Sequence, residues 1–169
     1  MKNYKPIIIV AGEPNSIFFE IFFKIVKNNK FKSPIILIGS KNLIQKNMKF
    51  FKLKIKINEI DYSKKKIIES KLNKINLIDV KYNQKKVFEK ISKKSNNYIK
   101  KSFEIALKIL DTKITNKFIN GPITKKFFLE NNFVGITEYL AKKSNSKNVS
   151  MIIYNKLLSV SPLTTHLPV

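Results

Sequence analysis

The sequence of 169 residues has no cysteine and no tryptophan, and it contains only one histidine and four glycines. The absence of cysteine excludes disulfide bonds, thiolate nucleophiles, iron–sulfur clusters and zinc ribbons. A chain of this length buries roughly 70% of the surface that its unfolded form exposes, so it needs no such cross-link to fold. One histidine with scattered carboxylates cannot make a complete metal site, because a catalytic ion normally takes three protein ligands.

Arginine is also absent: all 34 basic residues are lysine, against 11 acidic residues, which gives a net charge of +23. A surface that binds phosphate groups would favour arginine, whose planar guanidinium group makes bidentate hydrogen bonds to phosphate. Lysine, isoleucine and asparagine dominate the chain, and all three have A/T-rich codons. We therefore interpret much of the charge as base composition and do not expect a nucleic-acid partner. A Lys-rich polyanion-binding module stays the alternative, because a high net charge attracts polyanions at low salt.

Long apolar runs are missing as well. The run at residues 6–11 is too short to span a bilayer, and lysines interrupt the later runs. We therefore expect a soluble cytoplasmic protein without a membrane partner.

What is present is a repeated unit of apolar strand, glycine and helix. Such units predict an α/β fold with a largely parallel sheet flanked by helices. The expected strands are 7–11, 35–39, 53–57, 75–80 and 117–121, and the expected helices are 17–26, 41–48, 84–111 and 137–144, the last capped by Thr137. A hairpin is expected from strands 149–154 and 157–165 around Asn155-Lys156.

Three of the four glycines, Gly12, Gly39 and Gly121, follow expected strands. Ligands of open parallel sheets bind outside the carboxyl ends of the strands. Together with the polar residues of the last third, this predicts a polar cleft from residues 121–138 and 164–166. By position alone, His166 is a general base, a metal ligand or a buried histidine with its hydrogen bonds satisfied. Neither a P-loop nor a G-x-G-x-x-G fingerprint is present.

Several motifs, taken together and in order, resemble those of 4-hydroxythreonine-4-phosphate dehydrogenases. They are Ala11-Gly12-Glu13-Pro14 with Glu20, Asn120-Gly121-Pro122-Ile123-Thr124-Lys125, Gly135-Ile136-Thr137-Glu138-Tyr139-Leu140-Ala141 and Thr164-Thr165-His166-Leu167-Pro168. The resemblance runs from end to end of the chain. It implies a fold like that of isocitrate and isopropylmalate dehydrogenases.

The resemblance also implies an activity in pyridoxal phosphate (vitamin B6) biosynthesis. Enzymes of this family oxidise the 3-hydroxyl of 4-phosphooxy-threonine, a small phosphorylated hydroxy-amino acid, with NAD or NADP, and the resulting β-keto acid then loses its carboxylate. They are homodimers and use a divalent metal such as Zn, Mg or Co, bound by histidines. By the same resemblance, Thr137 contacts the substrate and His166 is one metal ligand.

Two features of the chain depart from the family pattern. Ile136 stands where the family usually has a substrate-binding histidine, and an isoleucine cannot donate a hydrogen bond. Family members are also about twice as long as this chain. We therefore expect an amino-terminal half, with part of a first α/β domain at 1–120 and the start of a metal- and substrate-binding domain at 121–169.

Such a half is expected to be inactive and poorly soluble alone, since apolar surface would be exposed where the other half docks. The catalytic residues are not identified, and the cofactor-binding residues are expected in the other half. Ile136 leaves a related dehydrogenase for another hydroxy acid phosphate open as an alternative.

Overall fold

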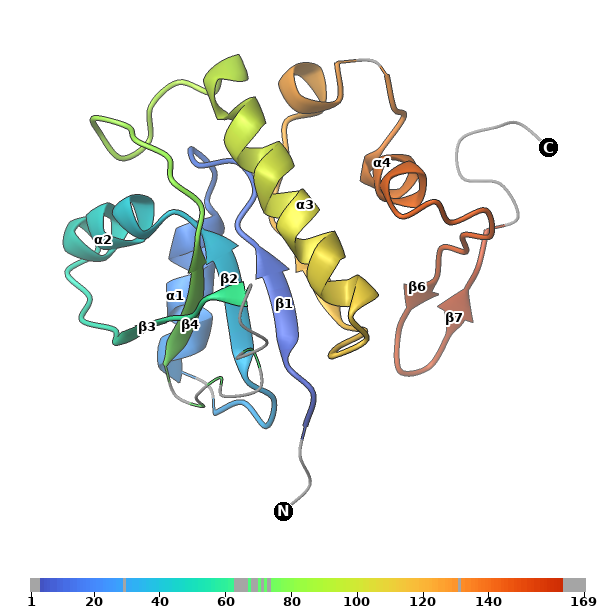
Figure 1. The fold of residues 1–169 in the computed structure, drawn as a ribbon, viewed down its shortest axis with the longest axis horizontal. Helices are drawn as coiled ribbons and strands as arrows, with labels where there is room; N and C mark the ends of the chain where they lie inside the picture. The colour runs from blue at the N-terminus through green and yellow to red at the C-terminus, as the bar shows by residue number, and fades with distance from the viewer. Residues whose placement is uncertain are drawn as a thin grey trace. The chain divides into compact units, whose positions relative to one another are not determined.

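A computed structural model describes residues 4–28, 30–62, 67, 70, 72, 74–130 and 132–162. The chain forms two compact units, Met1–Phe128 and Leu129–Val169 (Figure 1). No helix among the described residues is both long enough and apolar enough to cross a membrane.

The first unit is built on a parallel sheet of five strands. In chain order they are β1 (Ile7–Val10), β2 (Ile35–Gly39), β3 (Ile57–Glu59), β4 (Ile75–Asp79) and β5 (Phe118–Asn120). Their order in the sheet is β3-β4-β2-β1-β5, so β1 lies between β2 and β5. The apolar runs of β1 and β2 are almost completely buried, as expected for parallel strands covered on both faces. The predicted α/β class with a largely parallel sheet is confirmed.

Helices cover both faces of this sheet. They are α1 (Phe18–Asn28), α2 (Lys41–Phe50) and α3 (Asn96–Asp111), with a 3₁₀ turn η3 (Lys93–Ser95) before α3 and a π-helical turn η4 (Lys125–Leu129) after β5. Helices α1 and α2 contact each other, whereas α3 packs on β1 and β2 and crosses in front of the sheet in Figure 1, with α1 behind it. The chain runs outward in the sheet from β1 to β3 and then back to β5. Connections between parallel strands are right-handed in nearly all proteins, and with such a reversal of direction they place helices on both faces of the sheet.

Aromatic rings fill the layers between helices and sheet. Under α1, the rings of Phe19 and Phe23 stack at 5.9 Å, and Phe23 is fully buried. On the opposite face, the ring of Phe103 on α3 contacts Phe118 of β5 at 6.1 Å and Phe128 at 5.8 Å. The core of the first unit therefore has one aromatic layer on each side of the sheet.

Two element boundaries differ from those expected. The third strand begins at Ile57 and not at residue 53, because the amide of Leu53 still bonds to the carbonyl of Met48 at the end of α2. Helix α3 begins at Asn96 and not at residue 84. The Glu89 carboxylate accepts the amides of Lys85 and Lys86 at 2.7 and 3.0 Å, and this turn replaces the expected helical start.

The second unit contains α4 (Ile136–Lys143) and a hairpin of β6 (Ile153–Tyr154) and β7 (Ser159–Val160). The hairpin is confirmed, but its strands are shorter and its loop spans residues 155–158, in which the Asn155 amide bonds to the Leu158 carbonyl. Thr137 was expected to cap α4; instead the helix begins one residue earlier and its N-cap is Gly135. The predicted Thr137 cap is therefore wrong.

Substitution of the buried ring under α1 tests the core. We expect Phe23→Ala to lower the free energy of unfolding by about 3–5 kcal/mol, because it removes a fully buried ring and leaves a cavity. Phe50→Ala on α2 is the matched control, and its half-exposed ring should cost under about 1.5 kcal/mol. Urea denaturation of both variants measures the difference, and equal losses would contradict this description of the core.

Candidate functional site

The two loops that leave β1 and β5 meet at the carboxyl edge of the sheet. We call the meeting point the β1–β5 junction and define it as Gly12, Glu13, Gly121 and Pro122. The Gly121 amide donates to the carbonyl of Val10 at 2.7 Å, and the Glu13 amide donates to the carbonyl of Pro122 at 2.8 Å. These two hydrogen bonds join two motifs that lie more than 100 residues apart in the sequence.

Both glycines of the junction are required by close backbone approach. Gly12 has a φ of +75°, and a Cβ there would lie 2.3 Å from the Pro122 carbonyl oxygen. A Cβ on Gly121 would lie 2.2 Å from the carbonyl oxygen of Ala11. No side chain fits at either position without moving backbone, so the junction fixes the relative position of the two loops.

Glu13 of the junction carries a buried carboxylate. The Ser95 hydroxyl, in the turn before α3, donates to one carboxylate oxygen at 3.0 Å, and the Asn15 amide donates to the other at 3.4 Å. Burial raises the pKa of Glu13, and these two hydrogen bonds oppose that rise. The side chain thus connects the first loop to the start of α3 and is an acid–base group shielded from solvent.

Amide side chains extend this polar cluster. Gln84 donates from Nε2 to the Asn15 side chain at 3.2 Å and to the Lys86 carbonyl at 2.6 Å. Asn96 donates from Nδ2 to the Phe127 carbonyl at 2.7 Å. Within the described part of the chain, the buried oxygens Gln84 Oε1 and Asn96 Oδ1 receive no hydrogen bond. Two acceptors are therefore available on residues that flank the junction.

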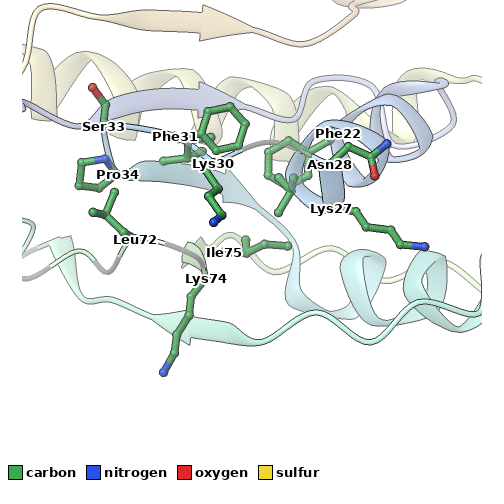
Figure 2. Close-up of a pocket in the computed structure, with 12 residues that line it drawn as sticks. Phe22, Lys27, Asn28, Lys30, Phe31, Ser33, Pro34, Leu72, Lys74 and Ile75 are labelled. Carbon is green, nitrogen blue, oxygen red and sulfur yellow. The ribbon is translucent and has the colours of Figure 1, made fainter.

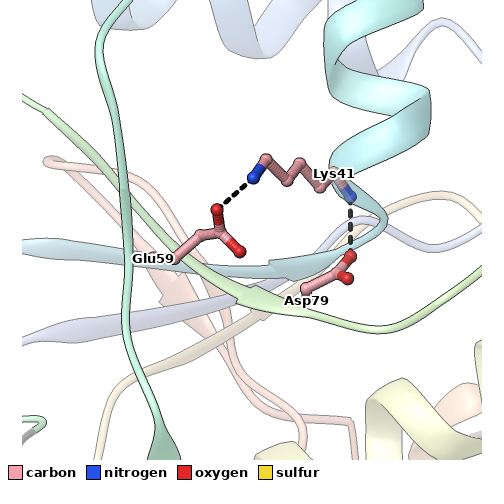
Figure 3. A network of polar contacts seen from close by, with 3 residues as sticks. All are labelled: Lys41, Glu59 and Asp79. Carbon is pink, nitrogen blue, oxygen red and sulfur yellow. Dashed lines mark hydrogen bonds and ion pairs between the residues drawn. The ribbon is translucent and has the colours of Figure 1, made fainter.

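A polar pocket of about 420 Å³ lies at the same edge of the sheet, beside the ends of β2 and β4. Lys41, the first residue of α2, donates its backbone amide to the Asp79 carboxylate at 2.8 Å, and its ammonium group pairs with Glu59 (Figure 3). The Glu59 carboxylate raises the pKa of Lys41. Because Asp79 already occupies the amino end of α2, that helix end is not open to an anionic ligand.

A second pocket, of about 320 Å³, lies at the opposite end of the strands (Figure 2). Ile35 and Ile75, which begin β2 and β4, line it together with Phe22 and the exposed Lys30. Ligands of open parallel sheets bind at the carboxyl ends of strands, so we rank this pocket below the junction as a functional site.

The structure describes one of the two site residues inferred from the sequence. Thr137 is half-buried in the first turn of α4, next to the half-buried Ile136. His166 lies outside the described residues, as does the part of the expected polar cleft at residues 164–166. Glu20 of the first motif is on α1 and pairs with Lys24 at 2.6 Å, so it does not belong to the junction.

Metal-ligating side chains do not gather in the described ranges: they hold no group of three or more His, Cys, Asp or Glu residues. The described residues therefore do not form a cation site by themselves.

Comparison of the sequence with models of known protein families gives a match over most of the chain. Residues 30–169 match the family model described as pyridoxal phosphate biosynthetic protein PdxA. The chain belongs to the PdxA family. The matched region includes the Asn120–Lys125 motif, which supplies Gly121 and Pro122 of the β1–β5 junction.

Curated relatives of this PdxA chain carry one name. A 4-hydroxythreonine-4-phosphate dehydrogenase of Sulfurihydrogenibium is 31% identical over 95% of this chain and 49% of the relative. Another, of Aquifex aeolicus, is 29% identical over 97% of this chain and 50% of the relative. The chain spans about half the length of the curated relatives that it matches.

A solved structure supports the same fold. The 4-hydroxythreonine-4-phosphate dehydrogenase of Burkholderia phymatum superimposes with a TM-score of 0.78 at 20% identity, covering 97% of this chain and 51% of that one. The expected isocitrate/isopropylmalate dehydrogenase-like fold is thereby confirmed over the part of that fold that this chain spans.

Three polar residues beside the junction, Gln84, Ser95 and Asn96, were not identified from the sequence. They belong to no motif and lie in a Lys- and Asn-rich stretch. The only local signal is the pair of serines at 92 and 95, which is typical of a helix start. The sequence did not indicate that this helix start lies against Glu13.

Alanine substitution tests the glycine requirement of the junction. We expect Gly12→Ala to lower the free energy of unfolding by about 2 kcal/mol or more, since it combines a positive φ with a clash against backbone. Gly39→Ala is the control, because its Cβ would meet the Ala11 side chain at 3.2 Å and no backbone atom. In urea titrations, the free energy of unfolding of Gly12→Ala should be well below that of Gly39→Ala. A Gly12→Ala variant as stable as the parent chain would show that the loops are not held as described.

The buried carboxylate predicts a dependence of stability on pH. The pKa of Glu13 is raised in the folded state, so the folded protein still holds the proton at pH values where the unfolded chain has released it. The contribution of Glu13 to the free energy of unfolding therefore falls as pH rises from its unfolded pKa near 4.5 through its folded pKa. Glu13→Gln stays neutral, so its unfolding free energy minus that of the parent should increase between pH 4 and pH 7.

Urea titrations at several pH values measure this difference. Glu20→Gln, which removes a partly exposed carboxylate from α1, controls for the change in net charge. A difference between Glu13→Gln and the parent that stays flat or shrinks with rising pH would contradict the burial cost assigned to Glu13.

Proposed function

We propose that this chain is the amino-terminal half of a 4-hydroxythreonine-4-phosphate dehydrogenase that acts in vitamin B6 biosynthesis. The observation that carries the proposal is the family match over residues 30–169, with relatives of that name aligned over nearly the whole chain. Two motifs of the resemblance also meet in one backbone junction at the carboxyl edge of the sheet.

The proposed reaction oxidises the 3-hydroxyl of the phosphorylated hydroxy-amino acid. The carbon-bound hydrogen leaves as hydride to NAD or NADP, and the hydroxyl proton is released. The β-keto acid that results then loses its carboxylate as CO₂. In this chain, the Thr137 hydroxyl would bind substrate and His166 would be one ligand of a divalent cation such as Zn, Mg or Co.

We propose the following roles for the two parts of the chain. Residues 1–120 supply the sheet of a first α/β domain, and 121–169 begin a second domain that binds substrate and metal. The other ligands and the cofactor contacts would come from the second half of the protein, which would act as a homodimer. By itself the chain is then an inactive fragment.

One observation favours a second candidate, a related dehydrogenase for another hydroxy acid phosphate. Ile136 lies beside Thr137 in the first turn of α4, and its apolar side chain offers no hydrogen bond to a substrate. By contrast, the lysines do not favour polyanion binding, since they occur on α1 and α2 over one face of the sheet and on α3 over the other.

A chimaera tests the proposed activity. Residues 1–169 joined to the carboxyl-terminal half of the Sulfurihydrogenibium relative should reduce NAD or NADP with 4-hydroxythreonine-4-phosphate, followed by absorbance of the reduced cofactor. Thr137→Ala should lower kcat/KM at least about tenfold, the size of one lost substrate hydrogen bond. Thr112→Ala, at the exposed end of α3, is the matched control.

Two further variants test the proposed metal ligand and the substrate class. His166→Ala should abolish turnover if it is a metal ligand. Ile136→His should raise kcat/KM for 4-hydroxythreonine-4-phosphate if Ile136 weakens the binding of that substrate, and should not raise it if the natural substrate is another hydroxy acid phosphate. A folded chimaera that reduces no cofactor with either class of substrate would contradict the proposal.

A further inference from the structure

The connections that leave β2 and β4 turn to opposite faces of the sheet. The two strands are neighbours, and Gly39 at the end of β2 pairs in register with Asp79 at the end of β4. The chain leaving β2 enters α2, which contacts α1, whereas the chain leaving β4 leads to α3 on the other face (Figure 1). In open parallel sheets, ligands bind outside the carboxyl ends of strands at the point where the connections diverge in this way.

The polar pocket of about 420 Å³ lies at this point. Its volume is within the range of small-molecule sites, which is about 300–1,000 Å³. The first turn of α2 and the loop after β4 line it with the exposed amide side chains of Asn42, Gln45 and Asn83. Within the described ranges these three side chains have no hydrogen-bond partner, so they are available to a ligand.

A buried hydroxyl group, that of Tyr98 on α3, lies below the pocket. The side chain is 4% exposed, and its ring packs at 5.1 Å on that of Tyr82, which lines the pocket. The hydroxyl oxygen lies 3.4 Å from the point that a Cβ on Gly39 would occupy, so it reaches the end of β2. Burial raises the pKa of Tyr98, and the nearby Asp79 carboxylate adds to that rise.

The Tyr98 hydroxyl makes no hydrogen bond to the described residues. Nearly all buried polar groups in folded proteins have a partner, and a group without one needs an explanation. A ligand in the pocket supplies that partner, either directly or through an ordered water.

The charges around the pocket do not favour an anion. Asp79 accepts the Lys41 amide at the amino end of α2, where an anion would otherwise bind, and the Lys41 ammonium group pairs with Glu59 (Figure 3). Lys81 also lines the pocket, so these four side chains carry two charges of each sign. The pocket therefore suits a ligand without net charge.

Hydroxyl groups match the polar lining. A hydroxyl both donates and accepts hydrogen bonds, and each amide side chain does the same, while the Asp79 carboxylate accepts from two adjacent hydroxyls. The C–H face of a sugar ring packs on an aromatic side chain such as Tyr82. An apolar ligand, by contrast, would bury the amide and carboxylate groups without partners.

We propose that this pocket binds a neutral polyol of monosaccharide size. The inference goes beyond the proposed function and does not depend on it, because no residue of the β1–β5 junction lines the pocket. The phosphorylated hydroxy-amino acid that we propose as substrate is an anion, so the polyol pocket is a second site at the same edge of the sheet.

Binding is tested by titrating the ¹⁵N-labelled chain with D-ribose, D-glucose or myo-inositol and recording amide chemical shifts. We expect at least one of these polyols to give saturable shifts at residues 40–45 and 79–83, with a dissociation constant of about 10 mM or less. The phosphate ester of the same polyol should bind more weakly, because the amino end of α2 is already occupied by Asp79.

Three variants assign the site. Asp79→Asn removes the charge but keeps an acceptor for the Lys41 amide. Asn83→Ala removes an exposed amide, and Tyr98→Phe removes only the buried hydroxyl. Each should weaken binding at least about fivefold, the size of one lost hydrogen bond. Asn116→Ala, which removes an exposed amide just before β5 at the opposite end of the strands, is the matched control and should leave the dissociation constant unchanged.

The shifts of residues outside the pocket report whether each variant is folded, and the exposed loop position of Asn83 keeps one pocket variant decisive if the other two unfold. The inference is overturned by the absence of saturable shifts with all three polyols, by saturable shifts confined to other parts of the chain, or by binding that folded pocket variants leave unchanged. Tighter binding of the phosphate ester would also overturn it, because the pocket would then be an anion site.

Discussion

The backbone contact between the loops after β1 and β5 is the constraint on which the rest of the first unit depends. Two glycines allow the loops to approach so closely that any side chain would overlap a carbonyl oxygen. Two backbone hydrogen bonds, from Gly121 to Val10 and from Glu13 to Pro122, then hold them. Because β1 lies between β2 and β5, this contact also determines where the carboxyl edge of the whole sheet presents its polar groups.

Around that contact the molecule separates apolar from polar surface. Below the edge, aromatic and branched side chains fill both faces of the sheet, and at the edge Glu13 is buried with Ser95 as its hydrogen-bond donor. Burying a carboxylate costs stability, which the raised pKa of Glu13 expresses. Ionisable groups with perturbed pKa values are common at functional sites, and ligands of parallel sheets bind at the carboxyl ends of the strands. The position of Glu13 is therefore typical of a ligand-binding edge.

Much of the fold could be predicted from the sequence, and less of the site. Apolar runs that end in Gly12, Gly39 and Gly121 indicate parallel strands, because buried strands are apolar throughout and the turns after them favour glycine. The start of α3 could not be predicted, since periodicity alone does not show that Glu89 holds a turn over residues 85–89. The motifs indicated the two loops of the site but not their contact, because pairing across more than 100 residues leaves no local signal. The roles of Thr137 and His166 stay predictions.

Amide hydrogen exchange of the intact chain tests most directly whether the junction holds the two loops together. We expect the amides of Glu13 and Gly121, although both lie in loops, to exchange as slowly as those of β1, since both are hydrogen-bonded across the junction. The amides of the exposed β6–β7 hairpin provide the fast reference. Exchange at Glu13 and Gly121 as fast as in that hairpin would contradict the account, because the loops would then be free to separate.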